Sequence, residues 1–168
     1  MPAPYVELHC HSSFSFLDGA SSPLELATAA AELGYPALGL VDHDGIWGSM
    51  EFAVSCKGAG ARPNTGTELT VSAGGRLFHL TLLVEDEAGY RNLCRLLTEA
   101  HAHTRDGQGR QAGQPSLPLE SLAGYAEGLV CLSGCARQGL VASAWAEGDL
   151  ARGTGFARRL LGFFGPDN

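Results

Sequence analysis

Two histidines on alternate residues, His9 and His11, follow a short apolar stretch at Tyr5–Leu8. On an extended backbone, residues i and i+2 point to the same side. A strand that ends in His-x-His therefore directs two imidazoles at one point, the smallest arrangement that can chelate a divalent cation. Asp18 follows in a Leu-Asp-Gly turn, which alone would explain it, but beside His-x-His it is a candidate carboxylate ligand.

A second apolar run, Ala37–Val41, ends in Asp42, His43 and Asp44. We predict that His43 is a metal ligand, because it closes a buried strand between two carboxylates. Asp42 and Asp44 either accept a hydrogen bond that orients an imidazole or cap the loop. Two strand ends that each carry histidine and a nearby carboxylate predict a centre that binds more than one metal ion.

The rest of the chain alternates between strand and helix patterns. Ser22, Pro23 and Glu25 predict an N-cap, a first-turn proline and a capping-box glutamate, and Gly34 suits the end of that helix. Gly74-Gly75 predicts a hairpin turn. Strands are expected at 37–41, 68–71, 77–84 and 129–132, and helices at 22–33, 48–59, 86–100, 140–147 and 150–164. This order predicts an α/β sheet or barrel with its functional side chains at strand carboxyl ends.

Three details of this assignment can be checked separately. The polar stretch Arg62–Thr65 predicts an irregular connection rather than the start of a strand. Tyr90, Leu93, Leu96 and Leu97 have the spacing of the inner face of one helix. The segment from His101 to Pro118, rich in Gly, Gln, Arg and Pro, predicts an exposed loop.

Composition narrows the class of protein. The 168 residues, 45% hydrophobic and 17% charged, are typical of one globular domain, and no apolar run reaches the roughly 20 residues of a membrane span. A cytoplasmic protein without a membrane partner is expected. The net charge of −7 argues against a broad basic surface for nucleic acid, so a phosphate substrate needs local metal ions. Five cysteines without a CxxC pair argue against a disulfide framework.

Several ordered motifs give the chain a specific resemblance to a known family. They are ELHCHS at Glu7–Ser12, FLDGA at Phe16–Ala20, GLVDHDG at Gly39–Gly45, GTELT at Gly66–Thr70, HLTLL at His79–Leu83, GYRNLCRLL at Gly89–Leu97 and EGLVCLSGC at Glu127–Cys135. Together they resemble the polymerase-and-histidinol-phosphatase (PHP) domain. The resemblance is specifically to the N-terminal PHP domain of bacterial C-family DNA polymerases, the alpha subunits of DNA polymerase III. The wording of the first two motifs is most similar to the error-prone branch.

The resemblance implies a fold and a ligand set. The implied fold is a distorted (β/α)7 barrel, which is expected to be incomplete because the family's last Asp-x-His motif is absent. Residues 1–168 would form one truncated PHP domain. The palm, thumb and fingers of a polymerase are not expected in this chain. The implied centre holds up to three divalent ions, favouring zinc and also admitting manganese or iron. Asp18 and Glu68 would be its carboxylate ligands beside a metal-activated water. The implied metal ligands are His9, His11, Asp18, His43, Glu68, His79 and Cys135.

Three functions remain open from the sequence. The first is metal-dependent phosphoesterase or 3′–5′ exonuclease activity in replication or translesion repair synthesis, with DNA reached through the full-length polymerase. The second is a non-catalytic scaffold that contacts the rest of the polymerase or accessory proteins. The third is a free-standing phosphoesterase similar to histidinol phosphatase.

Other candidate residues have simpler explanations. His101 and His103 form a second His-x-His, but their polar surroundings predict solvated side chains. Arg91 and Arg95 are expected to be surface charges on a helix. Packing roles are predicted for the remaining cysteines, Cys10, Cys56, Cys94 and Cys131.

Overall fold

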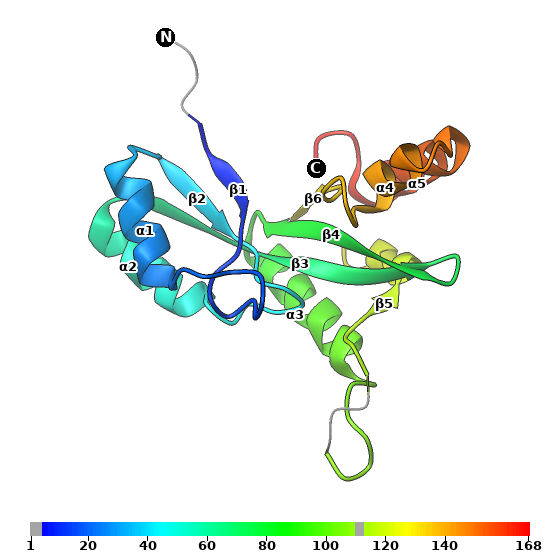
Figure 1. The fold of residues 1–168 in the computed structure, drawn as a ribbon, viewed down its shortest axis with the longest axis horizontal. Coiled ribbons are helices and arrows are strands. Elements are labelled where there is room, and N and C mark those ends of the chain that lie inside the picture. Colours follow the sequence, from blue (N-terminus) through cyan, green and yellow to red (C-terminus); the bar gives the residue numbers. More distant parts are fainter. Residues whose placement is uncertain (1–4, 110–112) are drawn as a thin grey trace. The chain divides into compact units, whose positions relative to one another are not determined.

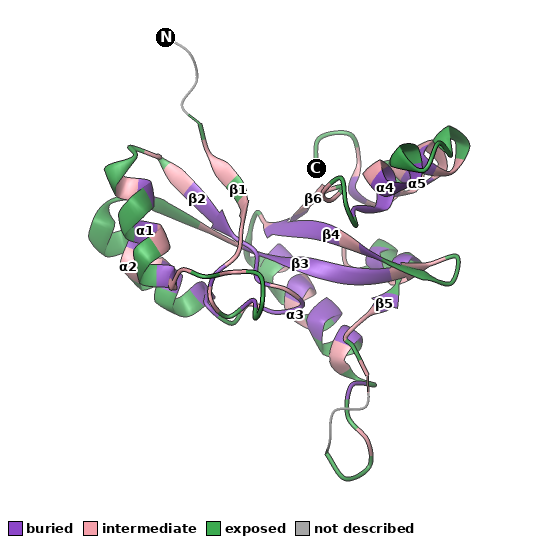
Figure 2. Cartoon of the chain, in the orientation of Figure 1, coloured by how far each residue is buried: buried purple, intermediate pink, exposed green. Residues whose placement is uncertain are grey.

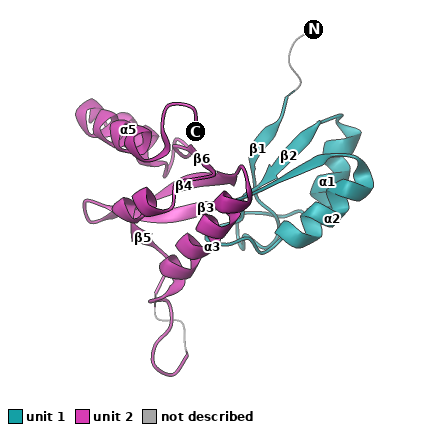
Figure 3. Ribbon diagram, turned by 180° about the vertical axis from the view of Figure 1, so that it is seen from behind, with its two compact units in different colours: residues 1–67 teal, residues 68–168 magenta. Residues whose placement is uncertain are grey.

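The computed structural model describes residues 5–109 and 113–168, so part of the predicted 101–118 loop, residues 110–112, lies outside the described residues. The chain divides into two compact units, residues 1–67 and 68–168, coloured separately in Figure 3. The boundary between them falls within one long strand, β3 (Arg62–Ala73). Figure 1 labels the elements along the chain.

The first unit contains a parallel sheet and two helices. Strand β1 (Glu7–Cys10) pairs with β2 (Ala37–Leu40), and β2 pairs in parallel with the first residues of β3. Helix α1 (Pro23–Glu32) begins at the predicted capping box, in which Ser22 and Glu25 bond each other's backbone N–H groups. Helix α2 (Ser49–Ala59) follows β2. The predicted caps of α1 are confirmed, and the predicted bounds of both helices agree to within two residues.

The core of this unit lies between the helices and β2. Helices α1 and α2 pack side by side (Figure 1), and small residues on α1 let them approach closely. Phe52 of α2 is fully buried and is the largest side chain of this core. The buried members of the cluster are Ala27, Ala30, Leu38, Leu40, Phe52, Cys56 and Ala61.

The start of β3 corrects one prediction. The polar stretch Arg62–Thr65 is not an irregular connection but the beginning of a regular strand. Its residues pair in register with Ala37–Leu40, so β2 supplies the hydrogen bonds that sustain it. Pro63 is tolerated there, and the polar side chains are exposed or half-buried. Pairing with a neighbouring strand therefore outweighs local propensity at this position.

The second unit is built on a hairpin. Strand β4 (Arg76–Val84) returns from β3 through the predicted Gly74-Gly75 turn, where both glycines have positive φ values of 58° and 76°. Strand β6 (Leu129–Leu132) pairs antiparallel with β4, and the short β5 (Leu117–Pro118) pairs in parallel with β3. The helical elements are α3 (Glu87–His101), the 3-10 helix η1 (Leu119–Gly124), α4 (Leu140–Ala146) and α5 (Leu150–Phe164). Neither β5 nor η1 was predicted.

Burial in this unit is concentrated on the hairpin and the inner face of α3 (Figure 2). Leu93, Leu96 and Leu97 are buried as predicted, but Tyr90 is 45% exposed, so the prediction for Tyr90 is wrong. Tyr90 lies in the first turn of the helix, where its ring extends beyond the core. In strand β6 only Leu129 is fully buried.

An ion-pair cluster joins the start of β4 to the turn between α4 and α5. Arg76 donates to both carboxylate oxygens of Glu147, at 2.8 and 2.7 Å, and Arg152 donates to Glu147 Oε2 at 2.5 Å. The hydrogen bonds from Arg76 and then Arg152 lower the pKa of Glu147 to about 2. Arg76 also lies 5.4 Å from the centre of the Phe78 ring.

We expect Glu147→Gln to lower the melting temperature at pH 7 because it removes the charge that both arginines share. A lowered folded-state pKa contributes stability above the unfolded value near 4.5, and that stability is lost as pH falls towards 2. The difference between variant and parent should therefore shrink between these limits, and also in high salt because the cluster is exposed. Thermal melts across pH measure this, with exposed Glu127→Gln as control. A pH-independent difference would contradict the assignment.

Both units are mixed α/β, as predicted, and their described strands follow open paths rather than closed ones. The incomplete, distorted (β/α)7 barrel implied by the resemblance stays a prediction. Among the described residues, no helix has the length and apolar character needed to cross a membrane.

Candidate metal centre

Three side chains of the first unit converge at the ends of β1 and β2. Asp18 Oδ2 contacts His11 Nδ1 and lies 3.2 Å from His43 Nε2, so one carboxylate oxygen joins both imidazoles. The His11 and His43 ring centres are 4.4 Å apart. One donor atom from each of the three residues lies within 4.8 Å of the others, a spacing that could hold a metal ion.

A distortion of β1 determines how His9 and His11 are presented. Glu7 pairs with Leu38 and Cys10 with Leu40, so β1 holds one extra residue and contains a bulge. His11 lies just beyond the strand, whereas we expected both histidines on one regular strand. Their ring centres are nevertheless 5.1 Å apart. The backbone N–H of His9 donates to Glu7 Oε1 at 2.8 Å, which fixes the bulged segment.

The loop that carries Asp18 is compact and strained. Leu17 has a φ of 68°, a left-handed conformation that costs a non-glycine residue about 1–2 kcal/mol. A Cβ on Gly19 would lie 1.9 Å from the Ser12 carbonyl oxygen, so only glycine fits there. The hydrogen bond from His11, with His43 adding to it, holds the pKa of the Asp18 carboxyl below its ordinary value against the effect of burial. The Asp18 carboxyl is therefore ionised at neutral pH.

The buried carboxylate of Asp42 holds together the two loops of the site, which follow β1 and β2. It is 1% exposed, and its carboxylate accepts from Ser12 N at 2.8 Å, Ser12 Oγ at 2.9 Å, Ser15 Oγ at 2.8 Å and Gly48 N at 3.2 Å. Ser15 Oγ in turn accepts from the backbone N–H of His43 at 3.1 Å. Of the two roles considered for Asp42, the structure favours the loop anchor, which fixes the backbone on both sides of the triad.

Thr67 completes this buried network. Its hydroxyl donates to the Asp42 carbonyl oxygen at 2.9 Å and accepts from Gly45 N at 3.0 Å. The loop after β2 is thereby tied to β3 on the side of His43. Asp44, at the turn of this loop, has a φ of 46°, which aspartate tolerates better than most residues.

The second unit carries two further predicted ligands, Glu68 and His79. Glu68 on β3 is 3% exposed at its side chain, and its Oε1 lies 3.2 Å from His79 Nδ1 on β4. Glu68 lies within the regular part of β3. A buried carboxylate beside an imidazole offers one oxygen and one nitrogen donor.

Cys135, the last predicted ligand, lies in the turn between β6 and α4, where its carbonyl oxygen accepts from Gly139 N at 2.8 Å. Within the described residues it is not part of a close group of three donors. His103 Nε2 lies 3.2 Å from the Gln114 carbonyl oxygen in an exposed setting, as expected of a solvated residue. Burial raises the pKa of Cys131 to about 12, which suits an inert packing thiol.

The donor set fits a divalent transition metal. Imidazole nitrogens are ordinary ligands of zinc, iron and manganese, and an ionised carboxylate can bind or bridge them. The triad supplies two imidazoles and one carboxylate, with side-chain exposures of 14% for His11, 31% for His43 and 56% for Asp18. The three candidate ligands are thus held in place by a buried network, and their side chains remain partly exposed to solvent.

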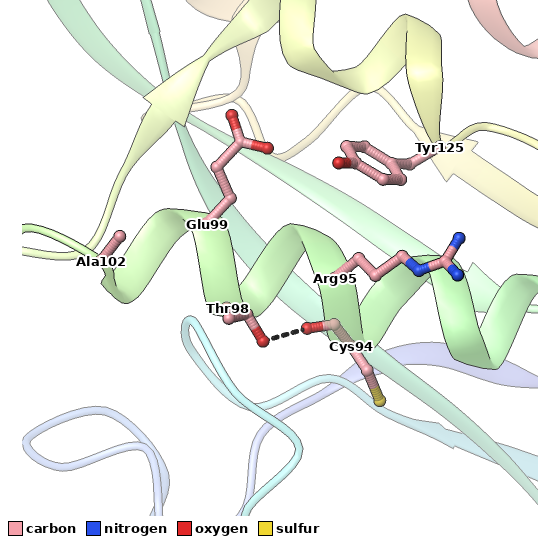
Figure 4. A pocket seen from close by; sticks show the side chains of 6 residues that line it. All are labelled: Cys94, Arg95, Thr98, Glu99, Ala102 and Tyr125. Carbon is pink, nitrogen blue, oxygen red and sulfur yellow. Dashed lines mark hydrogen bonds between the residues drawn. The ribbon is translucent and has the colours of Figure 1, made fainter.

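Sequence reasoning missed an open groove on the outer side of α3, shown in Figure 4. It has a volume of about 430 Å³, and Arg95, which we expected to be a plain surface charge, forms part of its wall. Tyr125, just after η1, faces Arg95 and Glu99 across it (Figure 4). The lining residues are Cys94, Arg95, Thr98, Glu99, Ala102 and Tyr125. The groove forms only because Tyr125 lies against α3, from which it is distant in sequence, so no local sequence motif predicts it.

Sequence comparison finds relatives along nearly the whole chain. The chain is 41% identical over 95% of its length to an error-prone DNA polymerase of Symbiobacterium thermophilum, of which the match covers 15%. It is 36% identical over 98% of its length to the DNA polymerase III subunit alpha of Treponema pallidum, of which the match covers 14%. The chain thus spans about one seventh of the length of these relatives.

Structural comparison agrees with this relationship. A solved structure from Bifidobacterium adolescentis, described as a candidate metal-dependent phosphoesterase, matches with a TM-score of 0.51 and 26% identity, covering 61% of this chain and 35% of the other. The family model for the PHP domain matches residues 7–168. The chain therefore belongs to the PHP domain family, and it is similar to the PHP region of error-prone DNA polymerases and DNA polymerase III alpha subunits.

Proposed function

We propose that this PHP chain binds divalent metal ions and hydrolyses phosphoester bonds. The observation that carries the proposal is the triad of His11, Asp18 and His43, whose donor atoms lie within 4.8 Å of one another. His9 adds an imidazole next to His11. Glu68, His79 and Cys135 are the ligands proposed for the second unit. Nitrogen and sulfur donors favour zinc, and the carboxylates also admit manganese or iron.

The residues of the triad suit this chemistry. A bound divalent ion supplies an activated water and offsets charge on the phosphoryl oxygens. His11 and His43 present ring nitrogens at fixed positions, because Ser15 and Asp42 hold the backbone beside them. Asp18 stays ionised and, being more than half exposed, lies at the substrate side of the triad. No other side chain of the triad carries negative charge that would repel a phosphate.

The relatives suggest a setting for this activity. Because they are DNA polymerases, we propose that the domain belongs to an error-prone polymerase and acts during replication or translesion repair synthesis. In that setting the substrate is the 3′ end of DNA, removed by exonucleolytic cleavage. The domain would then reach DNA through the full-length polymerase, whose other parts and accessory proteins are its partners.

The acidic charge favours a second function. A net charge of −7 gives the chain few cationic contacts for a DNA backbone. A scaffold that binds metal for stability and contacts the polymerase, without turnover, needs no such contacts. A free-standing phosphoesterase for small phosphate esters is the third candidate. It too would need no broad cationic surface, because bound metal ions alone could hold a small phosphate.

A cleavage assay separates these functions. The chain, loaded with zinc or manganese to measured stoichiometry, is incubated with a 5′-labelled single-stranded oligonucleotide and with p-nitrophenyl phosphate. We expect metal-dependent shortening from the 3′ end that weakens strongly with salt, and its loss in Asp18→Asn. Cleavage of the small ester alone would favour the third function. A metal-loaded chain that cleaves neither substrate would contradict hydrolysis and support the scaffold.

A further inference from the structure

The hydroxyl of Thr81 is a buried polar group that the fold itself does not use. Thr81 lies on β4 with 0% exposure, and its Oγ1 has no hydrogen-bond partner. Buried hydroxyls nearly always have a hydrogen-bond partner in the protein. Burial removes their hydrogen bonds to water, and leaving those bonds unreplaced destabilises the folded state. Valine has the same shape, favours strands and carries no such cost. The hydroxyl at this position therefore needs an explanation.

The position of Thr81 relates it to the pair of ligands proposed for the second unit. His79 and Thr81 are two residues apart on β4, so they lie on the same face of the strand. Counted outward from the two-residue Gly74-Gly75 turn, Glu68 on β3 is the residue opposite Thr81. Residues opposite each other have Cβ atoms about 5 Å apart on one face. Thr81 and Glu68 thus project from the same face of the hairpin, and the Glu68 carboxylate contacts His79 on that face at 3.2 Å.

We propose that Thr81 is a positioning residue for Glu68: its hydroxyl donates to the Glu68 carboxylate when that carboxylate is a metal ligand. This inference rests on the proposed metal-binding function. Without metal, Glu68 directs Oε1 to His79 Nδ1. A ligand carboxylate must instead be aimed at the ion, and a hydrogen bond from outside the ligand set fixes that orientation. Thr81 is the buried donor that stands on the correct face without another partner.

The test compares metal affinity and stability in three variants. Thr81→Val removes the hydroxyl and keeps the shape, while Thr81→Ser keeps the hydroxyl. Ser143→Ala is the matched control, because Ser143 on α4 is also buried with an unpartnered hydroxyl but lies outside the β3–β4 hairpin. Zinc and manganese affinities are measured by competition with a chromophoric chelator, and stability of the metal-free chains by thermal melting.

We expect Thr81→Val to bind metal about 10–100-fold more weakly than the parent. The metal-free melting temperature of Thr81→Val should be unchanged or higher, since an unsatisfied hydroxyl is removed. Thr81→Ser and Ser143→Ala should bind metal like the parent. Parental affinity in Thr81→Val, or equal weakening in Thr81→Ser, would overturn this role and leave the proposed function standing. A parent chain that binds no metal would overturn the proposed function itself.

Discussion

Replacing Asp42 with alanine is expected to lower the free energy of unfolding by about 4 kcal/mol. The carboxylate is 1% exposed and accepts hydrogen bonds from two backbone N–H groups and two serine hydroxyls. Alanine leaves these donors buried without an acceptor and adds a small cavity. Chemical denaturation followed by circular dichroism measures the change. Metal affinity should fall with it, because the loops of His11 and His43 lose their common anchor.

Asp167→Ala serves as the control for this prediction. It removes the same charge from an exposed residue near the end of the chain, so it should change the unfolding free energy by less than about 0.5 kcal/mol. Ser15→Ala is an intermediate test, since it removes one donor to Asp42 and one acceptor for His43 N. If Asp42→Ala is as stable as Asp167→Ala, the buried network does not hold the site together.

The double replacement His9→Ala with His11→Ala is expected to weaken zinc binding by at least about 100-fold. His11 contributes most of this effect, because it contacts Asp18 and its ring lies close to the rings of both His9 and His43. Without it, Asp18 also loses the hydrogen bond that keeps its pKa low. Metal content after purification and competition titration with a chelator both report the change.

The chain provides a closely matched control in its second His-x-His. His101→Ala with His103→Ala changes the same residue types at the same spacing, at the end of α3 and in the exposed turn after it. This variant should keep the metal affinity of the parent. Equal loss in both double variants would indicate adventitious binding by surface histidines, and an unchanged affinity in the first would exclude His9 and His11 as ligands.

Much of the local structure could be predicted from the sequence because its signals are local. The capping box at Ser22–Glu25 and the Gly74-Gly75 turn depend on residues a few positions apart, and both are confirmed. The apolar run at Ala37–Val41, which brings His43 to a strand end, is equally local. Residue type and spacing are enough where a few neighbours decide the conformation.

The remaining features depend on partners distant in the chain. The strand at Arg62–Thr65 forms because β2 pairs with it, despite its polar composition. The bulge in β1 depends on the register with β2. The role of Asp42 depends on Ser12 and Ser15, which lie about thirty residues earlier. A serine-rich stretch directly after His-x-His was the available signal for this network, but its acceptor could not be identified without the fold.

The most direct test of the account is to locate the metal. Crystals of the chain grown with zinc, with data collected at the zinc absorption edge, should give an anomalous peak about 2.0–2.2 Å from His11, His43 and Asp18. The Asp18 carboxylate should then contact the ion rather than only the imidazoles. A peak confined to other residues, such as His101 and His103, with none at the triad would contradict the central claim.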